Sequence, residues 1–332
     1  MIDLNHDELT IRFPEVHEQA TLAINLQRTL RIPDDERDYP LPAGLGRFPL
    51  RHVDDYARTV PARWIEHGGV MLPMYQAEAL WIAFRGMYPF AVKVATGKIN
   101  AVTGEDWREG LHRDPQDYLT TPPQPWLDGY CVERGVIRQF VAMPLGEGYT
   151  AEEQITGRGA VGGFQIVAYP LKREAFERYM DRLRVASRVA GLTATGVYLG
   201  SADFGLAAGG RMRQEIYQDD FALEDWDQRN RARCFVHIAN AQQWRAITGD
   251  APPTEPITAA TYRNAGIPWF DYYAADLQAL PGSGILSRLK SVAQLGKTKG
   301  QRPLPENDPI QVDHVVQLRR GLRRSEVRDG AF

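Results

Sequence analysis

The sequence predicts a β-rich α+β protein with two β-sandwich-like lobes and a few short helices. Apolar and polar residues alternate with a period of two in many short segments, as they do in strands. The 22 prolines and 30 glycines favour turns over long helices. One phrase also occurs twice, because Gly-Val-Ile-Arg-Gln-Phe-Val at 135–141 returns as Gly-Arg-Met-Arg-Gln-Glu-Ile at 210–216. A duplication would give two similar lobes with Arg138 and Arg213 at matching positions, whereas chance resemblance explains the phrase equally well.

Strands are predicted wherever alternation is bounded by turn residues. The clearest runs from Leu22 to Ile32 and ends at a turn over 33–36. Turns at 96–98 and 133–135 join neighbouring strands as hairpins. The other strands are expected at 90–95, 99–102, 117–120, 129–133, 136–143, 164–169, 233–239 and 310–318.

Helices and loops are predicted where the spacing of apolar residues departs from the alternation of strands. The prolines and glycines of 39–49 predict a loop crossing the surface. Apolar residues at helical spacing predict a short buried helix at 77–84 and an amphipathic helix at 172–186. Asn240 is expected to cap a further helix that reaches Ile247. Additional short helices are expected at 258–262 and around 285–295.

A segment of small residues at 187–210 predicts a junction between two parts of the chain. It contains six glycines and few large side chains. We therefore expect an N-terminal β-rich lobe over 1–186, ending in the amphipathic helix, and a C-terminal α+β lobe over 211–332 with a basic tail.

Composition limits the class of protein. Apolar residues make up 43% and charged residues 24% of the chain, and the net charge is -3. No segment approaches the roughly 18 uninterrupted apolar residues that a membrane span needs, and the start lacks a secretory pattern. Cys131 and Cys234 have no CxxC spacing, which argues against a disulfide framework or a thiolate zinc site. We expect a soluble protein of the reducing cytoplasm without a membrane partner.

The C-terminal segment is basic while the rest of the chain is acidic. Residues 285–332 hold ten Lys and Arg against five Asp and Glu. This segment either binds phosphate groups or folds back on the acidic body, and we favour the second reading. Nucleic acid is not the expected partner, because no aromatic residues alternate with these charges to stack on bases.

Seven phrases of the chain belong together, and they lie at 44–48, 74–78, 137–143, 212–217, 233–237, 244–249 and 266–273. These phrases look similar to an uncharacterised family of bacterial and fungal soluble proteins. No activity is assigned to that family, so the resemblance implies no catalytic residue, cofactor or partner.

The common local motifs of catalysis are incomplete in this sequence. Ser201 and Ser283 lack the flanking glycines of a GxSxG turn, and both are predicted to lie in linkers. Cys131 and Cys234 fall inside predicted strands, where a cysteine is usually a small buried apolar residue. Residues 291–298 end in Gly-Lys-Thr but lack the first glycine of a phosphate-binding loop and follow a helix. We expect no nucleotide role and no cofactor.

Two groups of acids and histidines are candidate metal ligands. His52 and Asp54 would lie on one face of a strand, although a hydrogen-bonded surface histidine is the simpler reading. The acidic run 219–227 could supply calcium ligands or paired carboxylates, or it could pair with the arginines at 229, 231 and 233. The candidate metal ligands are His52, Asp54, Asp219, Asp220 and His237.

Aromatic and arginine residues are candidate ligand-binding groups. The rings near 270 with their single carboxylate resemble a sugar or peptide platform, and a loop packed onto the protein by its rings is the alternative. The candidates are Trp269, Phe270, Asp271, Tyr272 and Tyr273, together with Arg138 and Arg213.

The sequence favours non-catalytic binding or assembly, with an unknown protein or small molecule as the partner and self-association into a homo-oligomer as one form of assembly. The alternative is a metal- or carboxylate-dependent hydrolase that uses the run 219–227 with His237 or His52. Nucleic-acid binding by the tail is a third hypothesis.

Overall fold

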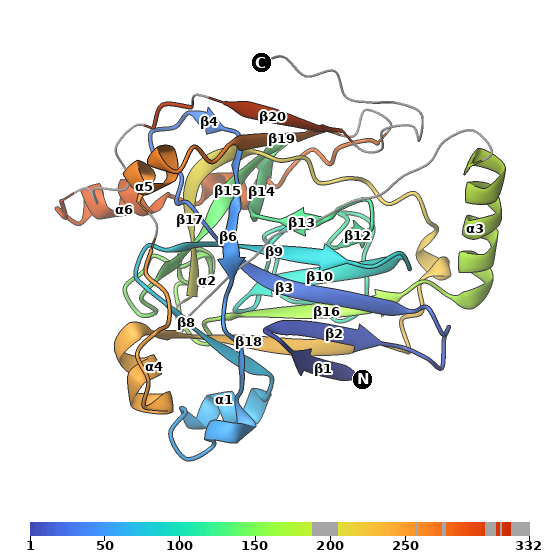
Figure 1. Cartoon of the computed structure of the whole chain (residues 1–332), viewed down its shortest axis with the longest axis horizontal. Helices are drawn as coiled ribbons and strands as arrows, with labels where there is room; N and C mark the ends of the chain where they lie inside the picture. Colours follow the sequence, from blue (N-terminus) through green and yellow to red (C-terminus); the bar gives the residue numbers. More distant parts are fainter. Residues whose placement is uncertain (188–204, 257, 274–276, 303–309, 313, 320–332) are drawn as a thin grey trace.

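Two large β-sheets face each other at the centre of the computed structural model, and helices lie around their edges (Figure 1). The structure describes residues 1–187, 205–256, 258–273, 277–302, 310–312 and 314–319. Within these residues strands predominate over helices, which confirms the β-rich α+β class.

The first sheet has ten strands in the described part of the chain. Its main path runs β1-β2-β3-β9-β15-β17-β4, and β6, β13 and β14 pair with β3, β9 and β15. Its strands are β1 (Ile2–Asn5), β2 (Glu8–Arg12), β3 (Thr21–Thr29), β4 (Asp38–Tyr39), β6 (Gly44–Arg47), β9 (Ala79–Arg85), β13 (Trp126–Leu127), β14 (Gly129–Glu133), β15 (Val136–Met143) and β17 (Gly205–Arg213).

The second and third sheets have seven and three described strands. The seven-stranded sheet follows β11-β10-β16-β18-β8-β7, with β12 against β10, and its β8 and β18 are parallel. Its strands are β7 (Arg51–His52), β8 (Val70–Met74), β10 (Phe90–Thr96), β11 (Ile99–Asn100), β12 (Leu119–Thr121), β16 (Phe164–Pro170) and β18 (Ala232–Asn240). The small sheet contains β5 (Leu41–Pro42), β19 (Trp269–Tyr273) and β20 (Val315–Arg319).

Helices lie mainly at the two ends of the sheets, with α1 and α4 together at the lower left of Figure 1 and α3 at the right. Among the described helices, none combines the length and apolarity needed to cross a bilayer. The helices are α1 (Ala62–His67), α2 (Ala151–Thr156), α3 (Arg173–Ser187), α4 (Ala241–Thr248), α5 (Ala259–Asn264) and α6 (Val292–Thr298), with 3-10 turns η1 (Asp54–Tyr56), η2 (Leu223–Asp225) and η3 (Leu286–Arg288).

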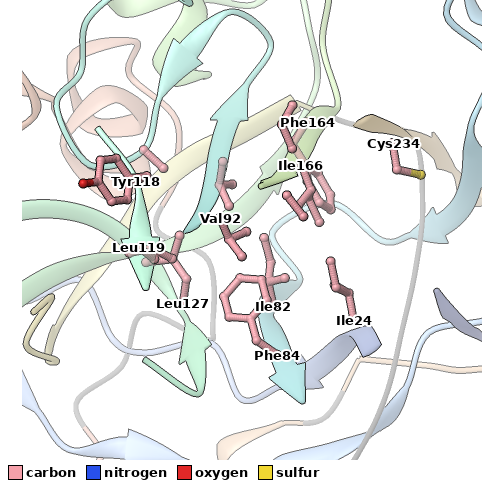
Figure 2. Close-up of a cluster of buried hydrophobic side chains, with 14 of the residues drawn as sticks. Ile24, Ile82, Phe84, Val92, Tyr118, Leu119, Leu127, Phe164, Ile166 and Cys234 are labelled. Atoms are coloured by element: carbon pink, nitrogen blue, oxygen red, sulfur yellow. The ribbon is translucent and has the colours of Figure 1, made fainter. Parts of the chain in front are cut away.

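The main core lies between the two large sheets. Figure 2 shows Ile24 and Ile82 of the ten-stranded sheet beside Val92 and Ile166 of the seven-stranded sheet. Burial of such side chains stabilises the fold by about 1.5–3 kcal/mol each. A second apolar cluster, which includes Trp269, packs the small sheet onto the ten-stranded one.

Two of the expected elements are wrong. The segment predicted as a helix at 77–84 is largely strand β9, because its register with β3 directs Leu80, Ile82 and Phe84 into the core. Local spacing fitted a helix, but long-range pairing decides the structure. The segment 39–49, predicted as a surface loop, instead contributes the short strands β5 and β6. Pro40 and Pro42 lie just before and at the end of β5, where the missing N–H is tolerated, and Pro49 lies beyond β6.

The predicted junction at 187–210 falls largely on residues outside the described part, including Ser201, and its last residues belong to β17. Strand β17 pairs with β15, and β18 pairs with β16 and β8. The two predicted lobes therefore share both large sheets. The two copies of the repeated phrase are not in separate lobes, since Ile137 lies opposite Met212 in neighbouring antiparallel strands. Most of the basic tail, 320–332, also lies outside the described residues.

Candidate functional site

A cavity of about 460 Å³ opens where the parallel strands β8 and β18 end. Parallel strands present their carboxyl ends at the same edge of a sheet, and ligands of open α/β sheets commonly bind there. It is bordered by three walls, formed by the turn after β8, the first turn of α4 and the loops around α2, and by Arg63 of α1. The lining residues are Arg63, Met74, Tyr75, Gln76, Pro144, Leu145, Gly162, Asn240, Ala241, Gln242 and Gln243.

The first wall is a tight turn that follows β8. Ala77 adopts a left-handed conformation with φ 66°, which lets the chain reverse between β8 and β9. The N–H of Ala77 donates to the carbonyl of Ala142 at 2.7 Å, and the N–H of Tyr75 donates to the Glu78 carboxylate at 3.1 Å. These bonds fix Tyr75 and Gln76 at the cavity.

A buried ion pair supports this turn from behind. The Arg28 Nε lies 3.1 Å from Glu78 Oε1, and the two side chains are only 8% and 4% exposed. The other side of the Arg28 guanidinium donates to the carbonyl of Glu255. Burial raises the pKa of Glu78 to about 7, although Arg28 and the Tyr75 N–H act in the opposite direction. Glu78 is thus a positioning residue whose charge changes near neutral pH.

The second wall is the start of α4, which the sequence specifies well. The Asn240 side chain accepts a hydrogen bond from the Gln243 N–H at 2.8 Å, as predicted for a helix cap. Trp244 and Ile247 are buried and hold the helix against the sheet. The polar first turn consequently faces the cavity while the later residues anchor the helix.

The third wall consists of two glycine-rich loops held by carboxylates of α2. Glu153 Oε1 accepts hydrogen bonds from the N–H groups of Gly146 and Gly148 at 2.7 and 2.8 Å. Glu152 binds the N–H of Gly162 at 3.0 Å. Burial opposes ionisation of Glu153, but the hydrogen bonds that it accepts outweigh burial and lower its pKa. For Glu152 burial dominates and raises the pKa.

The cavity is polar and locally positive. Arg63 from α1 lines it, and the lining drawn from the described residues includes no Asp or Glu. Three residues before Asn240, His237 is buried, donates a hydrogen bond from Nε2–H to the Gly68 carbonyl at 2.9 Å, and stacks on Trp64 at 4.9 Å between ring centroids. Burial lowers the pKa of His237 to about 4, and the charges of His67 and Arg63 act in the same direction.

The predicted aromatic platform is a strand. Trp269 is buried against Tyr262 in the second apolar cluster, and the ring of Tyr272 packs on Trp126 at 5.0 Å. Phe270 is half-buried and packs against the same apolar cluster. The segment therefore follows the alternative reading, in which its rings pack onto the protein. The side chain of Tyr273 lies outside the described part of the structure.

The two matched arginines have different surroundings. Arg138 is buried and contacts Glu36 at 3.0 Å and Asp34 at 3.7 Å. Arg213 is exposed and donates two hydrogen bonds, each of 3.0 Å, to the two carboxylate oxygens of Asp271. The structure thus joins Arg213 to another candidate ligand-binding residue, Asp271, through an ion pair, while Arg138 belongs to a separate structural cluster.

The candidate metal ligands do not form one site. Among the described residues, no group of three His, Cys, Asp or Glu side chains is arranged to hold a metal ion. His52 ends strand β7 and Asp54 begins the 3-10 turn η1, so the two do not share a strand face as predicted. His237 is buried beside α1, as described above.

The acidic run 219–227 is mostly engaged in local structure. The Asp219 carboxylate accepts hydrogen bonds from the Tyr118 hydroxyl at 2.6 Å and from Trp226 Nε1 at 2.8 Å. Asp220 is exposed and borders a second hollow of about 230 Å³. The predicted pairing with Arg231 and Arg233 is wrong, since both arginines bind Glu109. Asp225 instead pairs with Arg178, and Asp227 with Asn230.

Both cysteines are structural. They are buried, and burial raises the pKa of each thiol to about 12, far from the range of a nucleophilic thiolate.

Sequence reasoning missed the cavity, although the phrase at 74–78 and the cap at Asn240 mark two of its walls. Only the parallel pairing of β8 with β18, which no local pattern signals, brings Gln76 and Gln242 to one place. No protein-family model, curated protein or solved structure matches this chain.

Proposed function

We propose that this protein binds a small polar molecule in the cavity at the ends of β8 and β18 and does not transform it. The observation that supports the proposal is the cavity itself. Its volume of about 460 Å³ falls within the range of small-molecule sites, about 300–1,000 Å³. Its walls are held by a helix cap, a buried ion pair and two carboxylates, and a rigid support of this kind suits recognition.

The lining chemistry supports binding rather than catalysis. It combines amide side chains with the Tyr75 hydroxyl and an arginine, next to the apolar surfaces of Met74 and Leu145. Amides donate and accept hydrogen bonds but do not transfer protons at neutral pH. Among the described residues no cysteine, serine, histidine or carboxylate lines the cavity, and the Tyr75 hydroxyl is the one lining group of a type that enzymes use as a nucleophile or proton donor.

The test compares a variant that fills the cavity with one that alters distant surface. Gln76 is exposed at the cavity and accepts a larger side chain there without disturbing the core. Gln76→Trp should abolish binding of polar small molecules identified by thermal-shift screening and measured by titration calorimetry. Gln19→Trp, at an exposed position in the loop before β3, serves as the control. Equal binding by both variants would refute the proposed site.

A further inference from the structure

The charge around the cavity is the feature with the strongest implication for its ligand. Arg63 is exposed on α1 and lines the cavity. Glu66 lies one turn further along α1, yet the ion pairs formed within the described residues do not include one between Arg63 and Glu66. Arg63 is the one charged residue among the described lining residues of the cavity, and an arginine in such a position is a ready partner for an anion.

The charge of Arg63 also reaches the buried His237. Burial is the main cause of the lowered pKa of this histidine, and the charges of His67 and Arg63 lower it further. A positive charge at a cavity whose described lining holds no carboxylate favours an anionic ligand.

The first turn of α4 adds directional donors. Ala241 and Gln242 occupy the first two helical positions and line the cavity, while the Asn240 side chain satisfies the N–H of Gln243. The first N–H groups of a helix have no acceptor within the helix. Ala241 and Gln242 line the same cavity as Arg63, which suits a group with several acceptor oxygens.

We infer that the ligand carries a carboxylate or phosphate group, which Arg63 and the first turn of α4 bind, while the side-chain amides of Gln76 and Gln242 contact the neutral part of the molecule. This inference rests on the proposed function and assigns the chemical class of its ligand. Arg63 is then the residue that determines specificity for an anion.

The test uses succinate, inorganic phosphate and the neutral disaccharide trehalose as probes in titration calorimetry with the full chain. Succinate or phosphate should bind the unaltered protein, and Arg63→Gln should weaken binding about tenfold or more. Arg58→Gln is the matched control, because Arg58 is exposed shortly before α1 and does not line the cavity. Tighter binding of succinate would indicate that the ligand carries a carboxylate, and tighter binding of phosphate would indicate a phosphate group.

A second measurement separates a structural effect of the variant from loss of the anion contact. A bound anion beside Arg63 should raise the apparent pKa of His237, followed by its imidazole proton resonances, in the unaltered protein but not in Arg63→Gln. Binding should also weaken as salt rises from about 50 to about 200 mM.

The outcomes distinguish the two proposals. Binding of trehalose without binding of either anion would overturn the inference and leave the proposed function standing. Anion binding that Arg63→Gln leaves unchanged, or no anion binding up to roughly 10 mM, would also overturn the inference. Anion binding that depends on Arg63 but is unaffected by Gln76→Trp would place the anion outside the cavity and contradict the proposed function.

Discussion

Glu78 should make the stability of this protein depend on pH in an unusual direction. Its carboxyl group is buried beside Arg28, and burial raises its pKa from 4.5 to about 7. The folded state therefore retains the proton over a range in which the unfolded chain releases it. The stabilising contribution is complete below pH 4.5 and is lost as the pH rises through 7.

The size of this effect follows from the shift in pKa. A rise from 4.5 to about 7 corresponds to on the order of 3 kcal/mol in the free energy of unfolding, lost between about pH 4.5 and pH 8. Glu78→Gln keeps the shape of the side chain but cannot ionise. The difference in stability between the unaltered protein and this variant isolates the contribution of Glu78.

The assay is urea unfolding of both proteins at several pH values between 4.5 and 8. The unaltered protein should lose stability relative to Glu78→Gln as the pH rises. The comparison with the variant is essential, because His237 changes stability in the opposite direction over part of this range. A difference that stays constant, or that increasingly favours the unaltered protein at high pH, would show that attraction to Arg28 outweighs burial and would refute the reasoning.

Three further predictions concern the supports of the cavity and the candidate metal ligands. Glu153→Gln should destabilise the protein by about 1–3 kcal/mol in urea unfolding, because the carboxylate binds backbone N–H groups of the third wall, whereas the exposed Glu147→Gln should have little effect. Asp219→Asn should lower the free energy of unfolding by about 2–3 kcal/mol, because the amide NH2 of the new side chain would face the Tyr118 hydroxyl and the Trp226 Nε1–H, which are both donors. Asp220→Asn and added chelator should leave the melting temperature unchanged. The His237 imidazole should titrate near pH 4 when its proton resonances are followed by NMR. The neutral imidazole then stabilises the folded state above pH 6.5, and this contribution is lost as the pH falls from 6.5 towards 4. Titration near pH 6.5 would contradict the burial of this side chain.

Many of the strands could be predicted from the sequence because the pattern that indicates each of them lies within a few consecutive residues. Alternation in β3, β10 and β15 and the turn between β14 and β15 identify these strands before any pairing is known. The helix capped by Asn240 was equally predictable, since a cap is a contact between residues three apart. These confirmed elements share one property, which is that their signal lies within a few residues.

The remaining features depend on contacts between distant segments. The apolar residues of β9 fit the spacing of a helix as well as the alternation of a strand, and only the pairing of this segment with β3 decides in favour of a strand. The carboxylate of Asp219 looked like a metal ligand in the sequence, but Tyr118 and Trp226, which occupy it, come from other parts of the fold. A local sequence pattern shows which residue types are present, but it does not show which distant residues they contact.

The cavity was unpredictable for the same reason. Its walls come from α1, the turn after β8, the loops beside α2 and the start of α4, which are widely separated in the chain. Glu78 illustrates the difficulty, because the sequence shows only an acid within an apolar segment, whereas its role depends on Arg28 from β3. Sites assembled in this way leave no continuous motif to read.

Crystallographic screening of the full chain with small polar fragments would show whether the cavity at the ends of β8 and β18 is a binding site. We predict that bound fragments gather where β8 and β18 end and contact Gln76 or the first turn of α4. Fragments that gather instead in the hollow beside Asp220, with the larger cavity left empty, would contradict the account.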